Sequence, residues 1–400
     1  MIRKIFLVGI IGLNVQSDLC IKCRGIKHLC GLNRCPYIDY SLINPKISTD
    51  YTGISPPDIF IGHYGYPRVM VSALSSSKEI PKNLFPLNID KILEYRLSLY
   101  RVGNLERIDR KSKLIDKIQE IAISDIKMGI DAEYYKIDNM FSFDSIHIPL
   151  GPRIYAKRLD VIDQPNISRI AEKIYYDTDL KATEGLFFLY KNGFSVDYLR
   201  RVMSAGMVGV KLERKLVPTR WAITAVDDIV GKKLIDNIKD NESIDFSVYS
   251  YHSYMWNDFH ILILPGPWSF EMFENWYGRG NFRREIIGQG DYENYFGRKG
   301  YASNVTGAYY AARLAVLEYL NKIGKVGRVI VYREIGREYN IPLGVWIIRE
   351  SVREALKNPK IFNETNINRM WEIPENIRNA FQSSRTIQNI KKQKRLELYG

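Results

Sequence analysis

The 400-residue chain carries a formal net charge of +13, and its sequence pI is about 9.3. Hydrophobic residues make up 46% and charged residues 26%, which excludes general disorder, and the length predicts two or three domains. The positive charge favours a polyanionic partner, with nucleic acid as the first candidate and a basic protein without a nucleic-acid role as the alternative.

The N-terminal segment has two basic residues, Arg3 and Lys4, followed by an apolar run over residues 5–13. This order resembles a secretory signal peptide, but the run is short and no small-residue cleavage site follows it. We interpret the run as a buried strand at the edge of the first domain. No segment elsewhere has the roughly 18 apolar residues that a membrane span needs, so we expect a cytoplasmic protein.

All four cysteines, Cys20, Cys23, Cys30 and Cys35, lie in one short stretch with the spacing C-x2-C-x6-C-x4-C. Disulfides are not maintained in a reducing cytoplasm, so a cluster in a small part of a long chain favours metal binding. Four thiolates complete the shell of structural zinc and leave no open position for catalysis. An iron–sulfur cluster is the alternative, and His28 could replace one cysteine.

The residues after this cluster predict a mixed α/β body. Apolar triplets at 59–61 and 69–71 predict buried strands, and apolar residues at helical spacing predict an amphipathic helix within 105–128. Further strands are expected at 221–226, 246–256, 259–268 and 326–332, and helices at 306–324 and in the second half of 341–359. We expect four regions: a strand and zinc knuckle at 1–45, an α/β region at 46–275, a C-terminal region at 276–382 and a flexible basic tail at 383–400.

Five carboxylates are candidates for a magnesium site. Asp227 and Asp228 follow the expected strand at 221–226, and oxygen ligands at a strand end can hold a hard cation over a phosphodiester. Asp131, Glu133 and Glu334 could complete such a site. Because neighbouring residues of a strand point to opposite faces, we expect one aspartate of the pair to be a cap or turn residue.

A glycine-rich segment at 276–303 combines aromatic residues with basic ones. It lacks the glycine patterns of dinucleotide-binding and P-loop proteins, which disfavours a dehydrogenase or an ATPase. Cations interleaved with aromatics can pair phosphate contacts with base stacking, whereas ordinary packing aromatics in a connection are the alternative. The candidate nucleic-acid contacts are Arg279, Arg283, Arg284, Arg298 and Lys299.

The histidines give no sign of a catalytic triad. No G-x-S-x-G motif is present, and His63, His147, His252 and His260 lie scattered among apolar segments. We interpret them as core histidines, the commoner outcome for such positions.

Four segments together resemble the archaeal Nre DNA-repair family: "LCIKCRGIKHLCGLNRCP", "SPPDIFIGHYGYPRV", "PTRWAITAVDD" and "IPLGVWIIRESVREAL". The resemblance covers the chain from about Leu19 to the C-terminus. It implies a zinc-finger-like cluster, a role in repairing DNA damage, and a C-terminal motif that docks on the sliding clamp, PCNA. It does not identify catalytic residues.

The clamp-binding pattern is Q-x-x-h-x-x-a-a, where h is aliphatic and a is aromatic. In "QKRLELYG" it falls on Gln393, Leu396 and Tyr399, with Gly400 at the second aromatic position. Five basic residues against Glu397 alone give the tail few apolar groups for a core, so we expect it to be mobile until a partner orders it.

These observations favour a DNA-repair factor with a zinc knuckle, a DNA-contacting α/β body and a clamp-binding tail. Two alternatives remain open: a magnesium-dependent nuclease that acts on damaged or branched DNA, and an RNA-binding protein.

Overall fold

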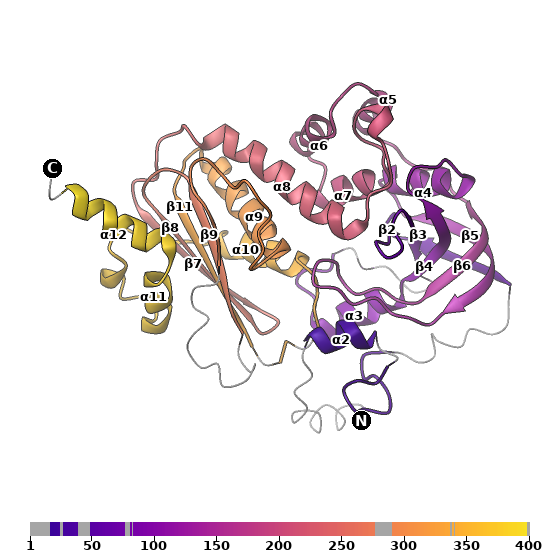
Figure 1. Ribbon diagram of the computed structural model, residues 1–400, viewed down its shortest axis with the longest axis horizontal. Coiled ribbons are helices and arrows are strands. Elements are labelled where there is room, and N and C mark those ends of the chain that lie inside the picture. Colours follow the sequence, from indigo (N-terminus) through magenta and orange to yellow (C-terminus); the bar gives the residue numbers. More distant parts are fainter. Residues whose placement is uncertain are drawn as a thin grey trace. The chain divides into compact units, whose positions relative to one another are not determined.

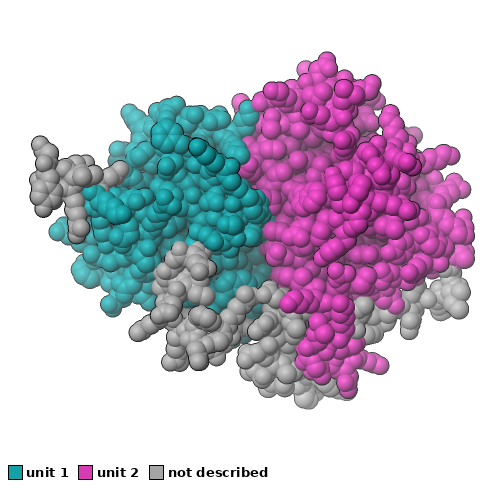
Figure 2. All heavy atoms as spheres, viewed as in Figure 1, with its two compact units in different colours: residues 1–17, 231–341, 345–400 teal, residues 18–230, 342–344 magenta. Residues whose placement is uncertain are grey.

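The structure is a computed structural model that describes residues 17–24, 27–38, 49–76, 81, 83–276, 290–336, 338–339 and 341–397. The expected strand at 5–13 lies outside these residues. The chain forms two compact units (Figure 2). Unit 1 comprises residues 1–17, 231–341 and 345–400, and unit 2 comprises residues 18–230 with 342–344. The expected division at 275/276 falls at the end of a strand of unit 1.

Unit 2 contains a six-stranded mixed sheet with the order β1-β5-β6-β4-β3-β2. The strands are β1 Asp50–Ser55, β2 Ile59–Ile61, β3 Arg68–Ser75, β4 Tyr100–Arg107, β5 Met128–Asp138 and β6 Arg153–Val161. Only β4 and β6 pair in parallel among the described strands of this sheet. Strands β2 and β3 confirm the buried strands predicted at 59–61 and 69–71.

The sheet of unit 2 curls so that β1 also meets the end of β3. Ile54 and Ser76 exchange two backbone hydrogen bonds of 3.0 Å, and the Tyr51 hydroxyl donates to Oγ of Ser75 at 3.1 Å. Gly53 lies at this close approach, where an added Cβ would come within 2.5 Å of Ser75 Oγ. The absence of a side chain at Gly53 therefore allows the closure.

The helices of unit 2 are α2 Ser17–Cys23, α3 Ile89–Ser98, α4 Lys113–Ile123, α5 Arg169–Tyr176, α6 Ala182–Lys191, α7 Val196–Ser204, the short η2 Lys211–Glu213 and the first part of α8 Thr219–Ile238. Helix α4 confirms the amphipathic pattern, because Ile115, Ile118 and Ile121 are all buried. Ser112 caps its N-terminus by accepting from the Ile115 N–H. The helix is shorter than the 105–128 window because β4 and β5 take the flanking residues.

Unit 1 contains a second mixed sheet with the order β10-β9-β11-β8-β7-β12. Its strands are β7 Ser247–Tyr254, β8 Asn257–Leu264, β9 Ser269–Trp276, β10 Asp291–Glu293, β11 Arg328–Ile335 and β12 Lys360–Phe362. Strands β9 and β11 run parallel, and β7 and β8 form a hairpin. The strands predicted at 246–256, 259–268 and 326–332 are thereby confirmed.

Helices cover both faces of this sheet (Figure 1). On one side lie α9 Gly307–Ile323 and α10 Trp346–Ala355. On the other lie η3 Ile367–Arg369, α11 Glu375–Gln382 and α12 Arg385–Glu397, which share an apolar core with Leu262 and Ile330 of the sheet. Gly324 ends α9 with φ of 66°, as a C-terminal glycine does. Unit 1 is thus a three-layer arrangement, and the expected mixed α/β body is confirmed.

The expected strand at 221–226 is wrong, and the expectation of a flexible tail fails for residues 385–390. Residues 221–226 belong to helix α8 rather than a strand, so Asp227 and Asp228 are helical residues and do not follow a strand. The tail is helical over Arg385–Glu397, and the side chains of Ile387 and Ile390 pack against the sheet. Two isoleucines three positions apart form an apolar stripe, which the low overall hydrophobicity of the tail conceals.

In the part of the chain that the structure describes, no helix is long and apolar enough to cross a membrane.

A histidine and arginine pocket in unit 2

A pocket with a volume of about 70 Å³ lies in unit 2 beside the end of β2. Its wall combines titratable side chains with an apolar floor that includes Phe60 and Met70. The polar residues that line it are Arg24, His63, Ser142, Asp144, His147 and Arg153.

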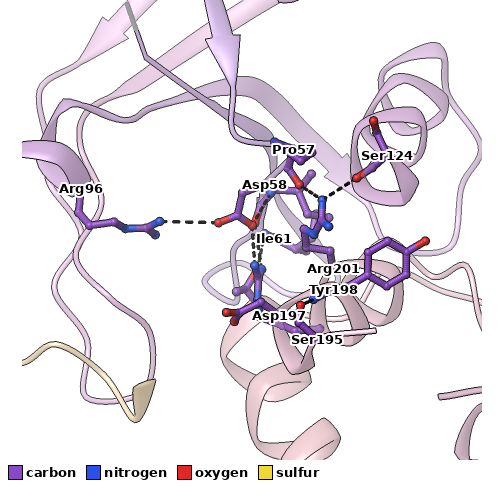
Figure 3. A network of polar contacts seen from close by, with 12 residues as sticks. Pro57, Asp58, Ile61, Arg96, Ser124, Ser195, Asp197, Tyr198 and Arg201 are labelled. Atoms are coloured by element: carbon purple, nitrogen blue, oxygen red, sulfur yellow. Dashed lines mark hydrogen bonds and ion pairs between the residues drawn. The ribbon is translucent and has the colours of Figure 1, made fainter. Parts of the chain in front are cut away.

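The strand that carries His63 into this pocket is fixed at its start by Asp58 (Figure 3). The Asp58 carboxylate accepts a hydrogen bond of 2.6 Å from Arg200 of α7 and lies 3.7 Å from a guanidinium nitrogen of Arg96 of α3. Arg201, also on α7, donates to the backbone carbonyls of Pro57 and Ser124. Two helices and the start of β2 therefore meet at one carboxylate that is only 16% exposed.

The charges in this network determine how Asp58 titrates. Burial alone would raise the pKa of Asp58, but the positive charges of Arg200 and Arg96 outweigh burial and lower it. The negative charge of Asp58 in turn raises the pKa of Arg200, although burial alone would lower it. The carboxylate therefore stays ionised, and its removal would leave buried arginines without compensation.

The other end of β2 is tied to the beginning of α8. The backbone N–H of Ile61 donates to Oγ1 of Thr219 at 2.9 Å, and both residues are buried. His63 lies two residues beyond this bond and Arg220 one residue beyond it. The hydrogen bond therefore places a histidine from one segment beside an arginine 157 positions later in the chain.

Arg220 contacts both of the other titratable groups at this side of the pocket. Its Nη1 atom lies 3.5 Å from Nε2 of His63 and 3.6 Å from Oδ2 of Asp144. Burial lowers the pKa of His63, Arg220 lowers it further, and Asp144 opposes the shift. His63 is therefore neutral at neutral pH. Since Arg220 can only donate, Nε2 of His63 is the acceptor and Nδ1 carries the proton.

His147 forms the inner wall of the pocket. Its Nδ1 donates to the Ile148 carbonyl at 2.9 Å, and Nε2 lies 3.5 Å from Oγ of Ser142 and 3.9 Å from Oδ2 of Asp144. Burial lowers the pKa of His147 despite the nearby carboxylate. The neutral ring therefore presents an unprotonated Nε2 toward Ser142.

Two further arginines make the pocket cationic. Arg24 follows α2 with φ of 53°, and its guanidinium lies 5.2 Å from the ring centre of Tyr64. Arg153 opens β6, and its Nη1 atom lies 3.9 Å from Oδ2 of Asp138. Arg24 and Arg153 line the pocket, and Arg220 lies beside it against Asp144, so three arginines accompany the two carboxylates Asp138 and Asp144. Such a pocket favours an anion.

Exposed aromatic rings belong to the same segments as the pocket: Tyr64 lines it, Tyr66 lies two residues further along, and Trp221 follows Arg220. Tyr64, Tyr66 and Trp221 are 65%, 50% and 47% exposed, and the rings of Tyr66 and Trp221 lie 5.4 Å apart. A surface that combines flat rings with guanidinium groups can stack nucleic-acid bases and contact phosphates. We refer to these three residues as the aromatic rim.

The structure does not assemble the carboxylates proposed for magnesium. Asp131 and Glu133 are exposed on β5, where they contact Thr52 and Lys157. Asp227 is buried within α8. Glu334 lies on β11 in the other unit, where it accepts from the Tyr332 hydroxyl at 2.9 Å. Across the described ranges, no three His, Cys, Asp or Glu side chains are placed to hold a metal ion. The assignment of these carboxylates to magnesium therefore stays a prediction.

Only two of the basic residues proposed as nucleic-acid contacts can be located. Arg279, Arg283 and Arg284 lie outside the described residues. Arg298 pairs with Asp291 at 2.9 Å and donates to the carbonyls of its own loop. It therefore stabilises the loop, whereas Lys299 is exposed.

The four cysteines lie in and directly after α2. Burial raises the pKa of Cys20 to about 12, and the charges of Cys35, Cys23 and Cys30 add to the increase. The thiols are thus near neighbours, although their positions do not meet the geometry of a metal site.

Gln393 and Leu396 of the clamp motif belong to α12 by their backbone, and Tyr399 lies outside the described residues.

Most of this pocket has no signal in the sequence. The interpretation of His63 and His147 as core residues fits the burial of His147 but not the position of His63 in the pocket wall. No sequence pattern points to Asp144. The available signal was the position of His63 between Gly62 and Gly65 after a buried strand, because loops at strand ends often carry function.

Comparisons with known proteins identify the family. The model described as "Archaeal Nre, N-terminal" matches residues 29–283, and "Archaeal Nre, C-terminal" matches residues 293–399. The chain belongs to the archaeal Nre family. The expected family resemblance is thereby confirmed, and no solved structure matches the chain significantly.

Curated Nre proteins are similar over most of their length. The chain is 36% identical to DNA repair protein NreB of Archaeoglobus fulgidus over 346 residues, which cover 84% of this chain and 87% of the relative. DNA repair protein NreA of the same organism is 36% identical over 358 residues, covering 86% and 90%. DNA repair protein NreA of Haloferax volcanii is 32% identical over 337 residues, covering 79% and 80%.

Proposed function

We propose that this Nre protein is a DNA-repair factor that binds single-stranded DNA through the aromatic rim and the arginines beside it. Its relatives carry the name DNA repair protein, and the net charge of +13 favours a polyanion. The observation that carries the proposal is that Tyr66 and Trp221 form an exposed pair beside Arg220. Stacked bases and contacted phosphates together account for sequence-tolerant binding.

Binding to a fluorescent single-stranded oligonucleotide tests this proposal. Trp221→Ala should weaken binding at least about fivefold, because stacking on one aromatic ring contributes about 1–3 kcal/mol. The affinity should also fall steeply with salt. Trp371→Ala is the matched control, since Trp371 is 76% exposed in unit 1. Equal losses in both variants, or tighter binding to RNA of the same sequence, would contradict the assignment.

We also propose that the C-terminal motif recruits the sliding clamp. Leu396 and Tyr399 would fill an apolar groove, and Gln393 would hydrogen-bond beside it. Removal of residues 393–400 should abolish capture of the clamp in a pull-down and leave the thermal midpoint unchanged. Undiminished capture would show that residues 393–400 do not bind the clamp.

Finally, we propose that the four cysteines hold a structural zinc ion. Four neighbouring thiols are a chemically suitable donor set, because a cation would replace their mutual repulsion with attraction. Cys23→Ala should lower the zinc content measured by mass spectrometry and destabilise the segment around α2. An unchanged zinc content would contradict the four-thiolate site, and bound iron with a visible absorption band would indicate a cluster instead.

A further inference from the structure

We propose that the histidine and arginine pocket binds the terminal phosphate monoester of a DNA strand, an inference that rests on the DNA-binding function proposed above. The pocket would then act as an end sensor beside the aromatic rim. Four features support this ligand: the charge of the pocket, its hydrogen-bond donors, its size and its position.

The charge of the pocket favours a strongly charged anion. Arg24 and Arg153 line the pocket with Asp144, and Arg220 lies beside it, 3.6 Å from Oδ2 of Asp144. Arg153 lies 3.9 Å from Oδ2 of Asp138, so the three guanidinium groups exceed the two carboxylates by one charge. A phosphate monoester carries close to two negative charges at neutral pH, whereas an internal phosphodiester carries one. The guanidinium groups therefore attract a strand end more strongly than a strand interior.

The donors also suit a phosphate group. Guanidinium groups present planar pairs of N–H donors that match phosphate oxygens. In the neutral tautomer derived above, His63 offers a further N–H at Nδ1. Arg220 is held by Asp144 at 3.6 Å and by His63 at 3.5 Å, so little side-chain freedom remains to be lost on binding.

The size of the pocket excludes larger groups. About 70 Å³ is room for a phosphate group, and it lies well below the roughly 300–1,000 Å³ of pockets that hold whole organic ligands. His147 and Phe60 close the inner side, and their rings meet edge to face at 5.3 Å. A pocket closed on its inner side admits a group that ends a chain.

The position of the pocket links it to the rim. Tyr64 lines the pocket and is also 65% exposed, and Arg24 lies over its ring. A terminal nucleotide can therefore stack its base on the rim while its phosphate enters between the arginines.

The test compares one oligonucleotide in three forms: with a 5′-phosphate, with a 3′-phosphate, and with hydroxyl groups at both ends. The full-length protein should bind one phosphorylated form about tenfold more tightly than the hydroxyl form, as expected for a charge-assisted contact. The arm that shows the preference identifies which end is recognised. The variant Arg220→Gln should bring the ratio of the affinities for the phosphorylated and hydroxyl forms close to one. Because Arg220 also belongs to the proposed DNA-binding surface, this ratio and not the absolute affinity is the quantity compared.

Two further variants separate the pocket from general effects. Arg158→Gln removes an arginine from β6 that is 75% exposed and paired with Asp160, so it should keep the preference. Arg24→Gln removes a pocket arginine from another element and should reduce the preference even if Arg220→Gln impairs folding, which the unfolding midpoint would reveal.

The outcomes distinguish this inference from the proposed function. Equal affinity of the wild-type protein for all three forms would overturn the end-sensing inference, while DNA binding that depends on Trp221 would leave the proposed function intact. Failure to bind any of the three forms would overturn both. A preference that survives Arg220→Gln and Arg24→Gln would place the phosphate elsewhere and also overturn the inference.

Discussion

The backbone N–H of Ile61 and the side-chain hydroxyl of Thr219 form a buried hydrogen bond of 2.9 Å that joins β2 to α8. Thr219→Val keeps the shape of the side chain but leaves the N–H without an acceptor. We expect a loss of about 1–3 kcal/mol in the free energy of unfolding, measured with urea. Thr219→Ser keeps the hydroxyl and should lose much less. Equal losses in the two variants would assign the effect to packing.

Asp58 should be among the most sensitive positions of unit 2. Asp58→Asn removes the charge that compensates Arg200 and Arg96, so we expect a loss of about 3–5 kcal/mol in the free energy of unfolding. The matched control is Asp109→Asn, because Asp109 pairs with Arg107 at the surface. A denaturation midpoint as high for Asp58→Asn as for the control would show that the network contributes little.

The stability of unit 2 should fall between about pH 7 and pH 5. Burial lowers the pKa of His147 in the folded state, so in this window the unfolded chain binds a proton that the folded chain does not. The free energy of unfolding should decrease by at most about 1.4 kcal/mol per pH unit for this group. The Asp58 carboxylate, whose folded pKa is lowered, loses its contribution only in more acidic solution.

The variant His147→Asn isolates this contribution. Its amide can still donate to the Ile148 carbonyl but does not titrate. The slope of stability against pH should become shallower, although His63, which is also shifted downward, retains part of it. An unchanged slope would show that His147 does not control the acid sensitivity.

Helix α12 should be a stable part of unit 1 over its first turns. Ile387 is buried in the core shared with α11 and the sheet, so Ile387→Ala should lower the free energy of unfolding by about 2–4 kcal/mol. Lys391→Ala, at an exposed position of the same helix, is the control. If Ile387→Ala left the free energy of unfolding unchanged and amide exchange were fast across residues 385–392, the tail would be mobile, as the sequence predicts.

The sequence predicted local elements better than their assembly. Strand β2 and helix α9 were predictable because an apolar triplet and a terminal glycine are local signals. Residues 221–226 form part of α8 although Ile223, Thr224 and Val226 are β-branched. Packing along a 20-residue helix outweighs that intrinsic preference.

The pocket was much harder to predict, because its members come from distant parts of the chain. His63 and Arg220 are 157 positions apart, and one hydrogen bond between their neighbouring residues brings them together. Each residue alone has an ordinary explanation as a core histidine or a helical arginine. Their common site becomes visible only when β2, α8 and the segment around Asp144 are assembled.

The start of α12 limits how far the clamp motif can reach. The Glu271 carboxylate, on β9, accepts from the backbone N–H groups of Arg385 and Thr386 and from the Thr386 hydroxyl, each at 2.8 Å. Gln393 follows along the same helix at about 1.5 Å per residue, which places it only about 10 Å from this anchor. A clamp bound through the motif would thus be connected to unit 1 by a short helical segment, and its motion relative to that unit would be restricted.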